Sequence, residues 1–84
     1  MHEYHIVEAA VKQIIEVAKN NQASKVTKVK LELGELSGLE ESSIRLYFKD
    51  ISSGTPVEGA ELIIEKSSQA GSGLYIKNIE VKPV

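Results

Sequence analysis

The first three residues, Met1, His2 and Glu3, place several nitrogen donors close together. The terminal amine, the His2 imidazole and the backbone nitrogens of His2 and Glu3 could all reach one metal ion. Four nitrogens in one plane suit Ni(II) or Cu(II), whereas zinc prefers a tetrahedral set of ligands. The tripeptide therefore predicts a square-planar metal site, although most histidines near an amino terminus are solvated and bind nothing.

His5 is a second candidate ligand. It lies three positions after His2 and would share its face of a helix, where it could supply another imidazole. The ordinary alternative is a solvated histidine in a first helical turn. No nucleophile motif of the GxSxG type and no phosphate-binding glycine loop occurs, so we expect a binding module and not an enzyme.

Composition narrows the class of protein. The chain has 84 residues, enough for one domain, and a net charge of −2 with lysines and glutamates interleaved. The absence of a basic stripe argues against nucleic acid as a partner. No apolar run approaches the roughly 18 residues of a membrane span, and no secretory leader is evident. We therefore expect a cytoplasmic protein with no membrane partner.

Hydrophobic periodicity predicts five elements in the order α-β-α-β-β. The first helix should have an apolar stripe of Ile6, Ala10, Ile14 and Val17, widened by Val7, Val11, Ile15 and Ala18. The second should have an apolar side formed by Leu39, Ile44, Tyr47, Phe48 and Ile51, with Leu46 beside it. Listed in chain order, the expected helices and strands are helix 3–21, strand 26–33, helix 40–53, strand 60–65 and strand 74–81.

The strand 26–33 sets the architecture. Val29, Leu31 and Leu33 alternate with charged residues, so one sheet face should be covered and the other wet. The predicted fold is a two-layer α+β domain, with two helices on one face of a three-stranded sheet. We expect the last two strands to be antiparallel neighbours, and a β-bulge at Lys77 and Asn78 to keep the last strand in phase.

Two connections carry local signals. Ser37 and Glu40 fit a capping box, with Ser37 as the cap of the second helix and Glu40 reaching back to it. Residues 67–73, SSQAGSG, have the composition of a flexible linker.

Several segments together resemble the nickel-binding domain of the HypA family of nickel metallochaperones. These segments are Met1-His2-Glu3 followed by Tyr4, then VKLELGELS at 29–37, GTPVEGAEL at 54–62 and YIKNIEV at 75–81. The resemblance covers residues 1–66 and 73–82 and implies a single nickel-binding domain over residues 1–84. Family members carry a zinc domain with two CxxC pairs where this chain has only the linker 67–73.

The resemblance also implies a function and a site. Ni(II) would be bound by His2, by the backbone nitrogen of Glu3 and by the terminal amine of Met1, and then passed on for [NiFe]-hydrogenase maturation. The expected partners are a HypB-type GTPase and the hydrogenase maturation machinery. A backbone nitrogen near Glu40 is a further candidate donor, while the Glu40 side chain is assigned to the capping box.

A second hypothesis is a structural domain without a working metal site. Such a domain would form a homodimer through a sheet edge, or by exchanging an element between protomers when a connecting segment is altered. Dependence of nickel binding on a free amino terminus would distinguish the two hypotheses.

The sequence makes a prediction about zinc. The chain has no cysteine and only two histidines, both near one end, so it cannot build a closed structural zinc site. We expect the purified protein to fold without zinc and to keep its thermal unfolding midpoint, measured by circular dichroism, when EDTA is added. Unfolding by the chelator would contradict this prediction.

Overall fold

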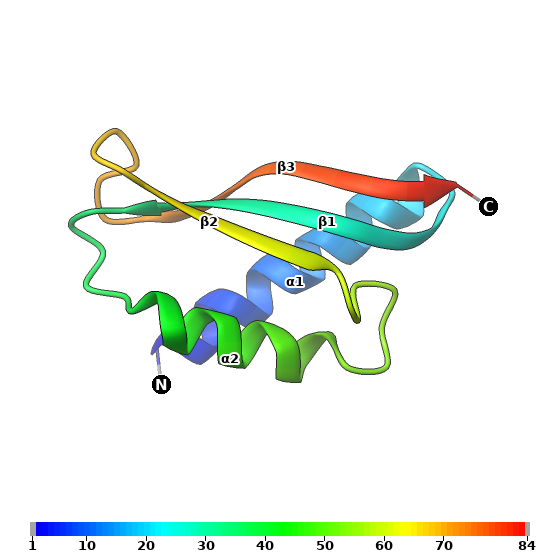
Figure 1. Cartoon of the computed structure of the whole chain (residues 1–84), viewed down its shortest axis with the longest axis horizontal. Coiled ribbons are helices and arrows are strands. Elements are labelled where there is room, and N and C mark those ends of the chain that lie inside the picture. Colours follow the sequence, from blue (N-terminus) through cyan, green and yellow to red (C-terminus); the bar gives the residue numbers. More distant parts are fainter. Residues whose placement is uncertain (1, 84) are drawn as a thin grey trace.

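A computed structural model describes residues 2–83, with only the backbone of His2. The predicted order α-β-α-β-β is confirmed, and Figure 1 shows both helices on the same side of the sheet. No helix in the described part of the chain has the length and apolar character needed to cross a membrane. In chain order, the elements are α1 (His2–Asn20), β1 (Ala23–Gly34), α2 (Glu41–Ser52), β2 (Glu61–Ser67) and β3 (Leu74–Pro83).

The strand order is β2-β1-β3, with β1 parallel to β2 and antiparallel to β3. The expectation that the last two strands are neighbours is therefore wrong, because β1 lies between them. The connection between β2 and β3 has six residues, 68–73, which at about 3.3 Å each can cross the end of β1 and span two strand spacings of about 4.8 Å. The most buried strand of the sheet thus gains a partner on both edges.

The expected face of β1 is buried. Val29, Leu31 and Leu33 are at most 1% exposed and pack against the helices. Val26 is buried with them because the register with β3 shifts between Val26 and Lys28, which turns Val26 inward as well. The two-layer α+β prediction is confirmed.

The helix stripes differ in detail from the prediction. On α1 the buried residues are Val7, Val11, Ile14 and Ala18. Ile6 and Val17 lie at the margin of this stripe, with 39% and 38% of their surface exposed. On α2, Ile44 and Phe48 of the expected apolar side are buried, whereas Leu46, expected beside that side, is 64% exposed.

The predicted bulge in β3 is confirmed. Asn78 pairs with Lys30 and Ile76 pairs with Leu31, so Lys77 is an extra residue in the ladder. This extra residue brings Ile76 and Ile79 to the same, helix-covered face, where both pack against the core.

The predicted capping box at the start of α2 is wrong. The N-cap is Glu40, which makes no side-chain hydrogen bond there, while the Ser37 hydroxyl accepts a hydrogen bond from the backbone of Leu39 at 3.2 Å. Gly38 has a φ of +72°, which keeps it out of a helical first turn and delays the helix.

Residues 67–73 are folded against the end of β1, despite their linker-like composition. Backbone hydrogen bonds join Gly34 to Gly73 at 2.9 Å, Leu36 to Gly71 at 2.9 Å and Glu35 to Ser67 at 3.2 Å. Ala70 is buried. A Cβ at Gly34 would lie 2.0 Å from the Gly71 carbonyl oxygen, so only glycine allows this close approach.

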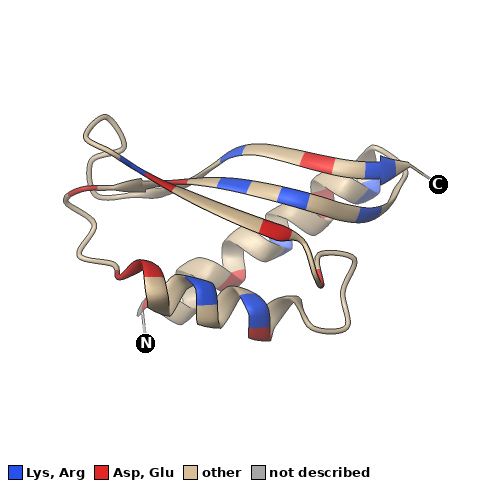
Figure 2. Cartoon of the chain, viewed as in Figure 1, with Lys and Arg blue, Asp and Glu red and all other residues tan. Residues whose placement is uncertain are grey.

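The other face of the sheet carries interleaved charges (Figure 2). Lys77 on β3 lies 3.1 Å from Glu65 on β2 and 3.8 Å from Glu32 on β1, and Lys30 lies 3.9 Å from Glu65. The hydrogen bond from Lys77, together with the charge of Lys30, lowers the pKa of Glu65, and the same bond raises the pKa of Lys77. These groups are exposed, so their effect on stability is screened by solvent.

Burial in the core predicts a large cost for truncating Leu31. Leu31→Ala should lower the free energy of unfolding by about 2–5 kcal/mol, since Leu31 is fully buried. Leu46→Ala is the matched control, and as a surface change it should alter stability by less than about 0.5 kcal/mol. Urea unfolding measures both. A loss under about 0.5 kcal/mol for Leu31→Ala would show that this residue is not core.

The ion pairs on the charged face predict how the titration of Glu65 should change when Lys77 is replaced. Lys77→Gln removes the hydrogen bond that lowers the pKa of Glu65, so that pKa should rise toward its ordinary value. The depressed pKa stabilises the fold at neutral pH, and this contribution is lost as the pH falls through the folded pKa. Carboxyl-carbon NMR titration measures the shift, with Lys25→Gln as the control that should leave Glu65 unchanged.

Candidate metal site

The first turn of α1 presents backbone nitrogens that the helix does not use. Because α1 begins at His2, the amides of His2 and Glu3 fall among the first four of the helix, which have no acceptor within it. A metal ion could therefore take these nitrogens without breaking a helical hydrogen bond. The predicted ligands Met1 and the His2 imidazole lie outside the residues and side chains that the structure describes.

Glu3 lies in the first turn and is partly buried. Its carboxylate is at the positive end of the helix dipole, where a negative charge is stabilising. The same charge would favour a cation held at the backbone nitrogens beside it. The structural role and the metal role of Glu3 are therefore compatible.

Tyr4 joins the first turn of α1 to α2. Its ring packs edge-on against the ring of Tyr47, with centroids 5.6 Å apart and an angle of 76° between the planes. Figure 1 shows the start of α1 and the first half of α2 at the same end of the molecule. Tyr47 is partly buried and packs against the core. Sequence reasoning did not identify this contact between Tyr4 and Tyr47.

His5 points along α1. Its Nδ1 lies 3.7 Å from Glu8 Oε1, and its side chain is 72% exposed. Its ring also contacts Tyr4 edge-on, with centroids 5.9 Å apart. The structure thus places His5 beside Glu8 and Tyr4, without a hydrogen bond between His5 and Glu8. Within the described residues, no three histidine or carboxylate side chains gather closely enough to hold a metal ion.

Glu40 is the N-cap of α2, and its carbonyl oxygen accepts a hydrogen bond from the Ile44 amide at 3.1 Å. Its own backbone N–H makes no hydrogen bond to residues 2–83. Figure 1 shows the N-terminal end of α2 and the start of α1 at the same end of the molecule, so Glu40 remains a candidate through its backbone, while its side chain is exposed.

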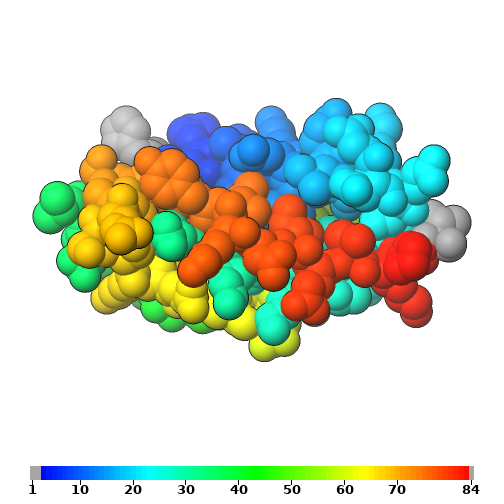
Figure 3. All heavy atoms as spheres, turned by 90° about the horizontal axis from the view of Figure 1, so that it is seen from above, coloured from blue at the N-terminus to red at the C-terminus, as the bar shows by residue number. Residues whose placement is uncertain are grey.

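The surface of residues 2–83 has two hollows, one beside the first half of α1 and one beside the C-terminal end of α2. One, of about 390 Å³, lies between α1 and β3, which Figure 3 shows side by side, and is lined almost entirely by apolar side chains, including Ile6, Leu74 and Tyr75. The other, of about 480 Å³, lies between α2, the segment that follows it and β2. Neither hollow contains a histidine.

Comparison with known proteins gives the same family as the sequence segments. Residues 1–72 match the family described as "Hydrogenase/urease nickel incorporation, metallochaperone, hypA". The chain is 34% identical to the hydrogenase maturation factor HypA of Caldanaerobacter subterraneus subsp. tengcongensis, over 98% of this chain and 77% of that protein. It is 38% identical to HypA of Chlorobaculum parvum, over 84% of this chain and 63% of that protein.

The fold is shared with a solved structure. The solution structure of the nickel metallochaperone HypA from Helicobacter pylori superposes with a TM-score of 0.88, covers 98% of both chains and is 19% identical. At that identity the likeness shows the fold alone. The family match and the identity to its curated members establish the assignment. The chain belongs to the HypA family of metallochaperones for nickel incorporation into hydrogenase and urease.

Proposed function

We propose that this chain binds Ni(II) at its Met1-His2-Glu3 terminus and passes it on for [NiFe]-hydrogenase maturation. The observation that carries this proposal is the start of α1 at His2, which leaves the first backbone nitrogens beside the histidine without helical partners. Membership of the HypA family, described by nickel incorporation, supports nickel as the metal. The chain spans about three quarters or less of the length of the two relatives above, so the activity is proposed for this part.

The donors would be the His2 imidazole and the backbone nitrogens of His2 and Glu3, with the Met1 amine or a backbone nitrogen near Glu40 as the fourth. A planar set of four nitrogens suits a d⁸ ion. The backbone nitrogens of Glu3 and Glu40 are amides that make no helical bond, one in the first turn of α1 and one at the N-cap of α2. His5 is left out of this set because its Nδ1 lies beside the Glu8 carboxylate, at 3.7 Å from Oε1.

Handover follows from the coordination geometry. A planar complex has two open axial faces, through which ligands of an acceptor protein can attack the metal. We propose a HypB-type GTPase as that acceptor, in the cytoplasm. The domain would extend over residues 1–84 and would work without zinc, since residues 67–73 stand where other family members are expected to carry a zinc domain.

Nickel titration tests the proposal. One Ni(II) should bind per chain and give a yellow, diamagnetic species, and His2→Ala should abolish it. His5→Ala is the matched control, and it should keep the stoichiometry because His5 is not among the proposed nitrogen donors. Isothermal titration calorimetry measures both variants. Unchanged nickel affinity in His2→Ala would overturn the proposal and leave the dimerising domain as the better hypothesis.

The proposal also predicts how nickel affinity should change with pH. Nickel must displace protons from the imidazole and the participating amides, so affinity should rise with pH across the neutral range. One glycine added before Met1 should weaken binding if the terminal amine is a ligand. Retained binding would assign the fourth nitrogen to the neighbourhood of Glu40.

A further inference from the structure

The buried stripe of α1 continues into its first turn through Tyr4. Val7, Val11 and Ile14 are buried in the core, and Tyr4 lies one turn before Val7 on the same side of the helix. Tyr4 is only partly buried, and its ring packs edge-on against Tyr47 of α2, with centroids 5.6 Å apart. The N-terminal end of the stripe is therefore a contact with α2.

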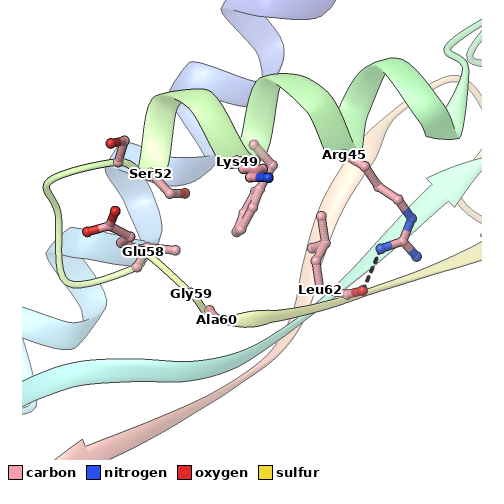
Figure 4. A pocket seen from close by; sticks show the side chains of 10 residues that line it. Arg45, Lys49, Ser52, Glu58, Gly59, Ala60 and Leu62 are labelled. Atoms are coloured by element: carbon pink, nitrogen blue, oxygen red, sulfur yellow. Dashed lines mark hydrogen bonds between the residues drawn. The ribbon is translucent and has the colours of Figure 1, made fainter.

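The ring that meets the first turn of α1 has a fixed place, because α2 is attached to the sheet. Ile44 and Phe48, on either side of Tyr47 along the helix, are buried in the core. Arg45 donates a hydrogen bond from Nη1 to the Leu62 carbonyl of β2 at 2.8 Å, as Figure 4 shows. Tyr47 is itself partly buried and packs against the core. Its ring is therefore a support, held from the sheet, for the first turn of α1.

This support acts at the place where the proposed donors end. Tyr4 directly follows Glu3, whose backbone nitrogen is the last proposed donor of the amino-terminal segment. The first amides of a helix have no acceptor within it, so a first turn frays readily unless a side chain holds it. A ligand that needs one conformation loses apparent affinity in proportion to the fraction of molecules that adopt it. The contact also fixes this turn relative to α2, whose N-cap offers the alternative fourth nitrogen.

The geometry of the two rings suits such a role. The planes of Tyr4 and Tyr47 meet at 76°, so the positive edge of one ring meets the negative face of the other. This attraction depends on both rings and not on a hydroxyl group. Alanine at either position would therefore lose it, whereas phenylalanine would keep it.

We infer that Tyr47 is a positioning residue for nickel, which it serves without touching the metal. Through the ring of Tyr4 it orders the first turn of α1 and so raises the affinity of the amino terminus for nickel. Linkage makes the effect mutual, so bound nickel strengthens the contact between the two rings. Nickel occupancy is thereby transmitted to α2, which contributes no side chain to the proposed donors. The inference rests on the proposed function, because it concerns the same nickel site.

Nickel titration calorimetry of the whole protein tests the inference, at a temperature where every variant is folded. Tyr47→Ala should weaken nickel binding by about three- to tenfold, the factor that corresponds to one aromatic pair. Tyr47→Phe should bind nickel like the parent. Ile51→Ala is the matched control, because Ile51 lies one turn after Tyr47 on α2 and is also partly buried against the core. It should stay within about twofold of the parent.

A double-mutant cycle separates the ring contact from a general loosening of α2. Tyr4→Ala removes the same contact from the side of α1 and should weaken nickel binding as well. In that background Tyr47→Ala should cost little further affinity, because the contact is already lost. Tyr4→Ala also tests the contact by itself if Tyr47→Ala does not fold.

Amide hydrogen exchange measures the order of the first turn directly. The amides of Ile6 and Val7 donate to carbonyls of that turn, four residues earlier in α1. Without metal, their exchange should be faster in Tyr47→Ala than in the parent, and unchanged in Ile51→Ala. Nickel should slow both amides in the parent, and slow them less in Tyr47→Ala.

Three results would overturn the inference while nickel binding itself stands. They are equal nickel affinities of Tyr47→Ala and Ile51→Ala, a full additional loss from Tyr47→Ala in the Tyr4→Ala background, or unchanged amide exchange in metal-free Tyr47→Ala. Failure of the proposed function gives a different result, since the parent would then bind no nickel or His2→Ala would bind it as tightly as the parent. That result would remove the inference together with the site.

Discussion

The burial of one face of β1 is the constraint on which the rest of this fold depends. Val29, Leu31 and Leu33 are buried against the helices, and the same strand pairs along both of its edges. The connections explain why β2 is parallel to β1 and β3 is antiparallel to it. The connection from β1 to β2 contains a helix, as parallel neighbours require, whereas only a short segment joins β2 to β3. The helices then cover the only apolar face available.

This arrangement also fixes where chemistry can occur. The core residues of α1, from Val7 to Ala18, hold the helix on the sheet, while its first turn extends beyond them. There the ring of Tyr4 packs against the ring of Tyr47 on α2. A helix end held by its neighbour offers unused amides at a defined place. Pre-placed nitrogens of this kind reduce the ordering that a metal ion would otherwise require.

Much of this structure could be predicted from the sequence, because local patterns determine it. Alternation in β1, the helical stripes and the phase slip at Lys77 each depend on neighbouring residues, and the elements and the bulge were correct. The strand order depends on which strand gains most from two partners, and no local pattern encodes that choice. The cap of α2 was misassigned because Gly38 takes a left-handed conformation that the capping-box pattern does not reveal.

The candidate site divides in the same way. The donor atoms at Met1, His2 and Glu3 follow from residue types at adjacent positions, so the sequence alone indicates them. The contribution of Tyr4 needs the packing of α1 on α2, which joins residues 43 positions apart. His5 was a candidate ligand only because of its spacing from His2, and in the structure it lies beside Glu8.

The way residues 67–73 meet the end of β1 has a consequence for the modularity of the fold. Ser67 is hydrogen-bonded to Glu35, and Gly73 to the preceding residue, Gly34. The segment therefore leaves and rejoins the sheet at the same place. Chain added between these two anchors would lengthen a loop whose ends are already fixed, and the entropic cost of closing a loop grows only slowly with its length. The sheet can thus gain or lose an entire inserted module at this junction while keeping its strand register.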